Sequence, residues 1–291
     1  MSSDKFGRIV RSLRAERYDH DTLAPWTQEK LADVAGMSVA TIQNIEQGRR
    51  KALESDELAT LAQALNLSVL ETHEFYAAAT EGDVGQVIDA DAGDGFDHLW
   101  SIFAAVQLPA YLIDSLHELV GVNTAMLTLA DYSPELLQHF EESSLGPHVL
   151  DILFRPDAPT RRALRSHWER ITRASLHRFR VTALRYRYLD RFQQIVDHLH
   201  DYPDFPALWQ ETREGTSGKH SLSSIYAYDD PHHGHLQYTT TLSMTLTAHG
   251  PLYLVVLLPL DDDTLGTFVQ LSTTNGEPHQ LIPWPNLDLS E

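Results

Sequence analysis

Side chains that can read base edges or hold phosphates gather between positions 28 and 51 of the 291-residue chain. Thr41 and Asn44 carry hydrogen-bonding groups that match base edges, whereas an apolar side chain such as that of Ala40 suits the thymine methyl group. Three consecutive basic residues close the stretch and indicate phosphate contacts, the alternative being a solvated helix end. The candidate DNA contacts are Gln28, Ser38, Val39, Ala40, Thr41, Gln43, Asn44, Arg49, Arg50 and Lys51.

Two short helices and a turn must position these side chains. Thr27 and Ser38 fit helix N-caps, because their hydroxyl groups can accept backbone N–H bonds of a first turn, and Gly36 fits the turn. Apolar residues recur at helical spacing and predict one buried stripe, made of Leu31, Val34, Ala35, Ile42 and Ile45. The pattern predicts a helix-turn-helix whose second helix keeps its opposite face open to DNA.

Around this motif, residues 6–79 resemble the lambda-repressor/Cro-like group, also called the xenobiotic-response-element family. The resemblance rests on the motif itself and on helices expected at 6–14, 56–65 and 68–79. It implies a bundle of five helices in which the second motif helix lies in the major groove, with its N-terminal residues at the base edges. Residues 18–26 form a longer link than is usual in the family, so family contacts made there are not transferred to this chain.

Length and composition leave room for a second domain. A bundle of about 80 residues leaves roughly 200 for another fold. The chain has no cysteine, which excludes disulfides, thiolate zinc sites, iron–sulfur clusters and a cysteine nucleophile. No secretory signal and no unbroken apolar run of membrane-spanning length stand out, so we expect a soluble, cytoplasmic protein.

The net charge of −19 opposes DNA binding only if the charges are evenly spread. Of the 22 Lys and Arg residues, nine lie at or before position 51, none between 52 and 154, eleven between 155 and 191, and two after that. The second cluster consists of Arg155, Arg161, Arg162, Arg165, Arg170, Arg173, Arg178, Arg180, Arg185, Arg187 and Arg191. It can be a solvated face that pairs with acidic residues, a second DNA-backbone surface, or an anchor for a ligand carboxylate at Arg178 or Arg180.

Beyond residue 80 the pattern changes twice. Residues 81–95 are rich in aspartate and glycine and indicate a linker, and a helix is expected at 96–107. Strands are expected at 108–114, 117–122, 224–228, 236–246 and 252–260, and helices at 123–130, 148–154, 160–179 and 183–200. This order predicts an α+β domain with a five-stranded antiparallel sheet and helices on one face. The expected division is 1–80, 81–95 and 96–291.

Five short motifs carry a second resemblance. They are PAYLID at 109–114, GVN at 121–123, VLDILF at 149–154, FPALW at 205–209 and DPHHGHL at 230–236. The order of strands and helices resembles a PAS-type sensor domain. Together with the N-terminal module, the motifs resemble the MmyB-like transcription regulators, which implies a C-terminal PAS-like half that binds a small ligand.

A ligand cavity in such a domain would lie between its helices and its sheet. The expected lining is largely apolar, with Arg178 as a handle for a carboxylate. Its candidates are Tyr111, Val122, Met126, Leu150, Phe154, Trp168, Leu176, Arg178, Tyr226, Tyr238 and Met244. Each of these residues would also suit a plain core. The lining favours an elongated, fatty-acid-like ligand, and no metal or other cofactor is expected.

Enzyme chemistry has little support in the sequence, and no catalytic residue is expected. HELVG at 117–121 starts like a zinc-protease motif but has glycine where the second histidine is required. His233 and His235 would share a strand face and could bind a metal with His232, Asp229 and Asp230. However, the carboxylate that follows the histidine pair in cupin barrels is missing. A cupin-like metal-binding regulator or enzyme tethered to DNA is the alternative.

The sequence thus predicts a DNA-binding transcription regulator that senses a small molecule. Repressor-like modules usually read two half-sites about 34 Å apart as dimers, so we expect a homodimer on double-stranded DNA. The helical parts of the C-terminal domain are the expected dimer contact. Ligand binding would then change the spacing or orientation of the two reading heads, which requires different ligand affinities for the two arrangements.

Overall fold

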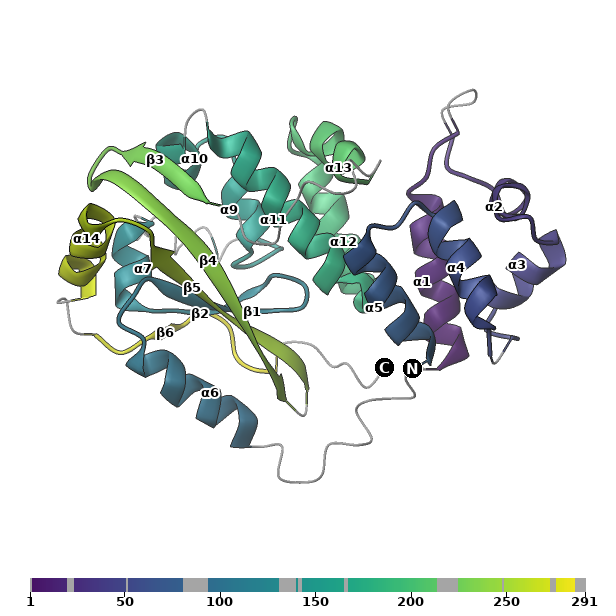
Figure 1. Ribbon diagram of the computed structural model, residues 1–291, viewed down its shortest axis with the longest axis horizontal. Helices are drawn as coiled ribbons and strands as arrows, with labels where there is room; N and C mark the ends of the chain where they lie inside the picture. Colours follow the sequence, from purple (N-terminus) through teal and green to yellow (C-terminus); the bar gives the residue numbers. More distant parts are fainter. Residues whose placement is uncertain are drawn as a thin grey trace. The chain divides into compact units, whose positions relative to one another are not determined.

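The computed structural model describes residues 2–19, 24–50, 52–80, 94–130, 140, 143–164, 167–213, 225–247, 249–272 and 276–285. Lys51, Arg165 and the predicted linker up to residue 93 lie outside the described residues. The chain divides into two compact units (Figure 1). Unit 1 comprises Met1–Val87, Arg180–Val196 and Trp209–Ser217, and unit 2 comprises Ile88–Phe179, Asp197–Leu208 and Gly218–Glu291.

Unit 1 contains the helices that the N-terminal sequence predicts. They are α1 (Ser3–Ala15), α2 (Gln28–Ala35), α3 (Val39–Glu46), α4 (Ser55–Ala64) and α5 (Val69–Thr80). The Thr27 hydroxyl caps α2 by accepting a backbone N–H at 3.2 Å, and the Ser38 hydroxyl caps α3 in the same way at 3.0 Å. Gly36 ends α2 at a φ of 61°, a left-handed conformation that glycine adopts easily. The predicted helix-turn-helix is confirmed.

The core of unit 1 draws on residues far apart in sequence. Ile9, Ile42 and Phe75 are completely buried in one cluster. Leu184 and Tyr188 belong to the same cluster, although the sequence placed them in the second domain. Leu184 begins the short 3-10 helix η4 (Leu184–Tyr186). Unit 1 is therefore larger than residues 1–80, and one predicted core residue, Val34, is instead 45% exposed.

The described part of unit 2 forms a six-stranded sheet with the order β3-β4-β5-β1-β2-β6, in which neighbouring strands are antiparallel. The strands are β1 (Ala110–Asp114), β2 (Leu119–Val122), β3 (Tyr226–Asp230), β4 (Gly234–Thr247), β5 (Gly250–Pro259) and β6 (His279–Gln280). The prediction of an antiparallel sheet with helices is confirmed. Its count of five strands was one too few, because β6 is too short for its alternation to stand out.

Helices cover both faces of this sheet, whereas the sequence predicted one. Leu112 packs with Phe103 of α6 (Asp94–Ala105), while the next residue, Ile113, packs with Ile152 of α9 (Val149–Phe154). Successive strand residues point to opposite faces, so the two clusters lie on opposite sides. The other helices are α7 (Thr124–Leu129), α10 (Pro159–Leu164), α11 (Trp168–Thr182), α12 (Asp190–His200), α13 (Phe205–Arg213) and α14 (Asp262–Ser272).

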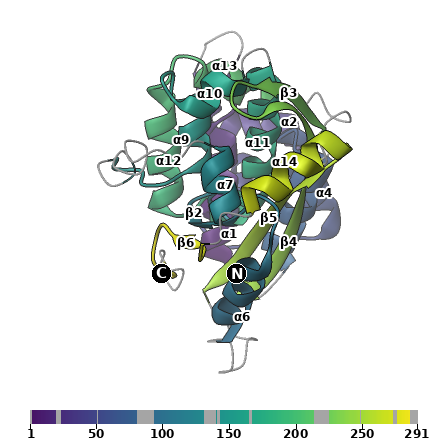
Figure 2. The ribbon, with the colours of Figure 1, turned by 90° about the vertical axis from the view of Figure 1, so that its left-hand side faces the viewer.

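Helix α14 packs against α7, β4 and β5 (Figure 2). Helices α11, α12 and α13 each carry residues of both units, since the division falls within them. In the part of the chain that the structure describes, we find no helix with the length and apolar character needed to cross a membrane.

Candidate DNA-reading surface and ligand pocket

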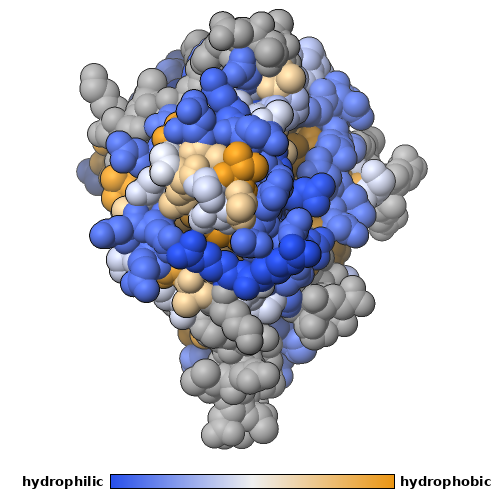
Figure 3. All heavy atoms as spheres, turned by 90° about the vertical axis from the view of Figure 1, so that its right-hand side faces the viewer, coloured by the Kyte–Doolittle hydropathy of each residue, from blue (hydrophilic) through white to orange (hydrophobic). Residues whose placement is uncertain are grey.

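The outer surface of α3 carries the predicted base-reading residues. Ile42 and Ile45 are buried in the core of unit 1, so the residues between and before them face outward. From the side on which Figure 1 draws α2 and α3, the molecule is mostly hydrophilic, with a small apolar patch (Figure 3). The outward set consists of exposed Ser38, Ala40, Gln43 and Asn44 and half-buried Thr41, whereas the predicted contact Val39 is half-buried and packs against the core of unit 1.

Three of the predicted contacts, Gln28, Ser38 and Thr41, already have partners within unit 1. The hydroxyl oxygens of Ser38 and Thr41 lie 2.8 Å apart, in addition to the cap bond. Gln28 Nε2 donates to Glu46 Oε2 at 2.8 Å. The Gln28 side chain is therefore held by the protein, and the first-turn N–H groups of α2 are better placed to approach a phosphate.

An ion pair that the sequence did not reveal fixes α3 against α1. Arg14 Nε donates to Glu46 Oε1 at 2.6 Å, and Arg14 Nη2 donates to Oε2 at 3.0 Å. This two-pronged arrangement restricts orientation as well as distance. The Glu46 side chain is only 3% exposed. No sequence period connects residues 32 positions apart, so the role of this pair in positioning the reading helix emerges only in the fold.

Two glycines allow α1 to approach α3 and the chain that follows it. A Cβ at Gly7 would lie 2.4 Å from the carbonyl oxygen of Ile45, closer than real Cβ contacts allow. A Cβ at Gly48 would lie 2.7 Å from the Cα of Asp4, and Gly48 also has a φ of 65°. The close packing of the reading helix α3 against α1 therefore requires that neither position carries a side chain.

One of the two described arginines that follow α3 forms an ion pair within unit 1. Arg49 is exposed. Arg50 pairs with Glu57 of α4 at 2.5 Å, and the two side chains are 35% and 25% exposed. A pair of this exposure contributes about 0–1 kcal/mol after solvent screening, so Arg50 can exchange Glu57 for a phosphate at little cost.

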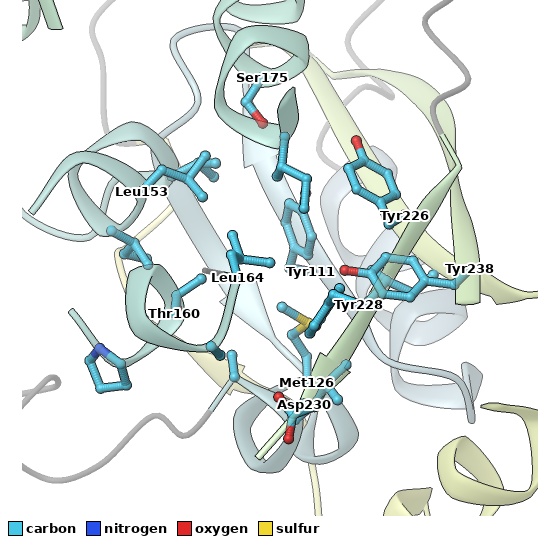
Figure 4. A pocket seen from close by; sticks show the side chains of 18 of the residues that line it. Tyr111, Met126, Leu153, Thr160, Leu164, Ser175, Tyr226, Tyr228, Asp230 and Tyr238 are labelled. Carbon is cyan, nitrogen blue, oxygen red and sulfur yellow. The ribbon is translucent and has the colours of Figure 1, made fainter. Parts of the chain in front are cut away.

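Unit 2 contains a pocket of about 460 Å³, within the size range of small-molecule sites. The sheet contributes residues of β1 to β5 to its wall, and helices α7, α9, α10 and α11 contribute most of the others (Figure 4). Five predicted lining residues do line it, namely Tyr111, Met126, Arg178, Tyr226 and Tyr238. The sequence thus pointed to the part of the domain that contains this pocket.

The other six predicted lining residues lie outside the pocket wall. Trp168 packs edge-on against Phe154 and donates its indole N–H to the Leu153 carbonyl at 2.5 Å. Met244 is 61% exposed on β4. The remaining four are completely buried in the core, namely Val122, Leu150, Phe154 and Leu176. The period of apolar residues identifies which side chains are buried. A cavity lies where buried side chains of facing elements leave space between them, so the period could not distinguish core residues from residues of the pocket wall.

Sequence reasoning also missed part of the pocket wall. On α11, Ile171, Ser175 and Arg178 follow the helical spacing of one face, so extension from Arg178 could have found the other two. No comparable signal marked the remaining wall residues, which include Leu119, Leu129, Ile152, Leu164, Tyr228 and Leu257.

Stacked tyrosines form one wall of the pocket. The rings of Tyr226 and Tyr238 are 5.2 Å apart and nearly parallel, and Tyr228 meets Tyr238 edge-on. Burial raises the pKa of Tyr228 to about 12 and raises the pKa of Tyr238 well above its ordinary value. These hydroxyls are therefore neutral near pH 7 and offer hydrogen bonds without negative charge. In Figure 4, Ser175 and the Tyr226 hydroxyl lie towards one end of the pocket and Asp230 towards the other.

Arg178 brings a positive charge into the pocket wall. Arg178 is only 7% exposed, and its Nη2 donates to Thr240 Oγ1 at 3.3 Å. Burial raises the pKa of the neighbouring Tyr111, and the Arg178 charge opposes this rise. Burial, Arg178 and His148 hold the pKa of buried His117 well below 6.5. At neutral pH the charge therefore resides on Arg178 and not on this histidine.

The structure separates two arginines that the sequence treated alike. Arg180, unlike Arg178, belongs to unit 1, where it donates to Glu71 at 3.0 Å and to Glu16 at 3.3 Å. Arg187 also pairs with Glu16. Further pairs join Arg161 to Asp204, Arg173 to Glu169 and Arg185 to Glu74. These pairs match the alternative in which the basic cluster pairs with acidic residues of the fold.

The histidine-rich turn between β3 and β4 is held by its own aspartates. His233 Nδ1 lies 2.9 Å from Asp230 Oδ1, and His235 Nδ1 lies 2.9 Å from Asp229 Oδ1. His233 is in the turn before β4, so it does not share a strand face with His235 as predicted. Among the described residues, no group of three or more histidine, aspartate or glutamate side chains is placed to hold a metal.

Comparisons with known families agree with this geometry. A model described as a helix-turn-helix domain matches residues 5–75, and a model described as the MmyB-like transcription regulator ligand binding domain matches residues 98–268. Fold and sites together define a ligand-responsive transcription regulator with a DNA-binding helix-turn-helix. Since the second match covers more than half of the 291 residues, the chain belongs to the MmyB-like transcription regulators. A comparison with curated protein sequences finds no match.

Proposed function

We propose that a homodimer of this chain binds an operator through α3 and changes its DNA affinity when an elongated apolar acid occupies the pocket of unit 2. The lining of the pocket supports the ligand class. Apolar residues such as Leu164 and Ile171 suit a hydrocarbon chain, and Arg178 suits a carboxylate. A fatty-acid-like molecule combines the two. The antiparallel sheet, with a pocket between its strands and helices, supports a PAS-like sensor domain.

The DNA-binding half of the proposal assigns base reading to Asn44 and phosphate binding to Arg49. We expect Asn44→Ala to relax sequence preference, with a loss of about 1–3 kcal/mol on the operator and little loss on unrelated DNA. Arg49→Ala should weaken binding to all sequences to a similar degree and reduce the salt dependence of the affinity. Binding to operator and scrambled duplexes at several salt concentrations measures both effects.

A substitution at another exposed residue of unit 1 is the control for these two DNA-binding variants. Val69 is 85% exposed on α5, so Val69→Ala should leave DNA affinity unchanged and serves as a matched surface change. Equal losses on operator and scrambled DNA for both Asn44→Ala and Arg49→Ala would refute the assignment of base contact to Asn44.

The ligand-binding half predicts that denaturing the purified protein releases an apolar carboxylic acid, identified by mass spectrometry. A charge-assisted hydrogen bond to a buried arginine contributes about 1.5–3 kcal/mol, so Arg178→Leu should weaken the binding of a long-chain fatty acid about 10- to 100-fold. Arg173→Leu, on the same helix, removes a surface pair with Glu169 and should have little effect.

The alcohol of the same chain length separates the carboxylate from the hydrocarbon. Wild-type protein should prefer the acid, and Arg178→Leu should bind acid and alcohol with similar affinity. Release of a polar metabolite, or equal binding of acid and alcohol to the wild type, would contradict the proposed ligand class.

A further inference from the structure

The pocket of unit 2 has polar side chains towards both of its ends (Figure 4). Ser175 and the hydroxyl of Tyr226 lie towards one end, and Arg178, which follows Ser175 by nearly one turn of α11, lines the same pocket. Asp230, the last residue of β3, lies towards the other end. A simple fatty acid has a polar group for only one of these ends.

The Asp230 carboxylate is buried, and its bonds within the protein all go to one of its two oxygens. The side chain is 5% exposed. Oδ1 accepts the backbone N–H groups of His232 and His233, each at 2.9 Å, and lies 2.9 Å from His233 Nδ1. Within the described part of the chain, Oδ2 accepts no hydrogen bond. A buried carboxylate oxygen without a donor is costly, so this end of the pocket favours a ligand group that donates a hydrogen bond.

Two hydroxyl groups add to the polar wall of the pocket. Burial raises the pKa of Tyr228 to about 12, and the negative charge of Asp230 adds to the rise, so this phenol is neutral and interacts with Asp230. Helix α10 packs against β3 and contributes Thr160 to the pocket wall. The Thr160 hydroxyl oxygen is buried and has no hydrogen-bond partner among the described residues. Buried polar groups are seldom left unpaired, so a polar ligand group is the expected partner.

A hydroxyl group suits Asp230 better than an ammonium group does. Arg162 of α10 is exposed and also lines the pocket, and its positive charge disfavours a second cation. A hydroxyl offers a donor for Asp230 Oδ2 and an acceptor for the hydroxyl of a threonine or tyrosine. Arg162 is also the weaker anchor for a ligand carboxylate, because solvent screens an exposed charge whereas Arg178 is buried.

We propose that the ligand is a long-chain acid with a hydroxyl group at the end opposite its carboxylate. Arg178 binds the carboxylate, Asp230 accepts the hydrogen of the hydroxyl, and apolar residues of the wall such as Leu164 enclose the hydrocarbon chain. The inference rests on the proposed function and narrows its ligand class from fatty acids in general to ω-hydroxy acids.

The dependence of affinity on chain length tests whether both ends of the ligand are anchored. Plain fatty acids should bind about fourfold more tightly with each added methylene until the pocket is filled. The ω-hydroxy acids should instead show one optimal length, because their two polar ends must reach Arg178 and Asp230 together. Isothermal titration calorimetry of the full chain, freed of bound lipid, measures both series.

The sign of the hydroxyl effect at the optimal length is the sharper measurement. A hydroxyl buried without a partner would weaken binding about 5- to 100-fold relative to the plain acid. Because a hydrogen bond to a carboxylate is stronger than a neutral one, the ω-hydroxy acid should instead bind about tenfold more tightly than the plain acid. The ω-methoxy acid, which cannot donate a hydrogen bond, should bind at least about tenfold more weakly than the ω-hydroxy acid.

Asp230→Asn exchanges the acceptor for a donor with little change of shape. The amide oxygen can keep the two backbone bonds of Oδ1, and the amide nitrogen, which cannot accept them, takes the place of Oδ2. The variant should therefore bind the ω-hydroxy and ω-methoxy acids with similar affinity. Asp229→Asn is the matched control, since the side chain of Asp229 is 86% exposed and pairs with His235. It should keep the wild-type preference for the ω-hydroxy acid.

Two results would overturn the assignment of the second anchor. One is a wild-type protein that binds the plain acid more tightly than the ω-hydroxy acid at every chain length. The other is an Asp230→Asn variant that keeps the full preference for hydroxy over methoxy. Binding of plain acids that depends on Arg178 would still support the proposed function in either case, whereas failure of all these acids to bind would refute the proposed ligand class itself.

Discussion

Arg180→Met is expected to lower the free energy of unfolding by about 3–5 kcal/mol, because it leaves the Glu71 carboxylate charged and unpaired in the core of unit 1. The side chains of Arg180 and Glu71 are each 3% exposed, and their closest N–O distance is 2.9 Å. Glu71 also holds the start of α5 by accepting the Ser68 N–H at 3.0 Å. Urea unfolding followed by circular dichroism measures the loss.

Arg185→Met is the matched control for this substitution. Arg185 also belongs to unit 1 and pairs with Glu74 at 2.7 Å, but the two side chains are 28% and 27% exposed. Its loss should cost about 0–1 kcal/mol. The double variant Arg180→Met/Glu71→Met should recover much of the loss, because the unpaired charge is gone. Similar losses for Arg180→Met and Arg185→Met would contradict the buried pair.

The pH dependence of the Arg180→Met loss gives an internal check. Burial raises the pKa of Glu71, but Arg180 and the bonds to Ser68 lower it more, so the net pKa is below 4.5. A lowered carboxyl pKa contributes stability above pH 4.5 that is lost as the pH falls through the folded value. The difference between wild type and Arg180→Met should therefore shrink in acid.

Gly7→Ala is expected to destabilise unit 1 and weaken operator binding together. A Cβ at this position would lie 2.4 Å from the carbonyl oxygen of Ile45 and 2.7 Å from that of Glu46, and backbone atoms cannot rotate away. Overpacking of this kind costs about 1–3 kcal/mol or more, which exceeds the gain of about 1 kcal/mol in helix propensity. Because the clash is with the C-terminal end of α3, it displaces the reading helix, and we expect DNA affinity to fall at least about tenfold.

The same substitution in α14 should have the opposite effect on stability. A Cβ at Gly266 would meet no described atom within 4 Å. Gly266→Ala should therefore raise the free energy of unfolding by about 0.5–1 kcal/mol and leave operator binding unchanged. Thermal unfolding and DNA titration of the two variants, side by side, measure this contrast. Unchanged DNA affinity in Gly7→Ala would show that the approach of α1 to α3 does not position the reading helix.

Local features of unit 1 could be predicted from the sequence because they depend on near neighbours. The caps at Thr27 and Ser38 join residues three positions apart, and Gly36 needs only its own φ. The buried stripe through Ile42 and Ile45 follows the period of one helix. These signals were enough to predict the helix-turn-helix and the face of α3 that points outward.

In unit 2, the sequence predicted the kinds of element and most strand positions but not the shape of the space between them. In β1, Leu112 and Ile113 are both apolar and the structure buries them on opposite faces, so an apolar side chain does not by itself indicate which buried face borders a cavity. Tyr111 and Tyr238 line the pocket, whereas Leu150 and Leu176, which carry the same apolar signal, fill the core.

The sequence by itself determined the class of most elements, though not of α13, α14 or β6, and the outward face of the reading helix, because the bonds within a turn and the periods of helix and strand depend on neighbouring residues. The tertiary structure decided which long-range partners meet. Arg180 pairs with Glu71 across 109 positions, and Arg14 pairs with Glu46 across 32. Such pairs leave no period in the chain, so only the folded packing assigns the 180–196 segment to unit 1 and turns Arg178 towards the pocket.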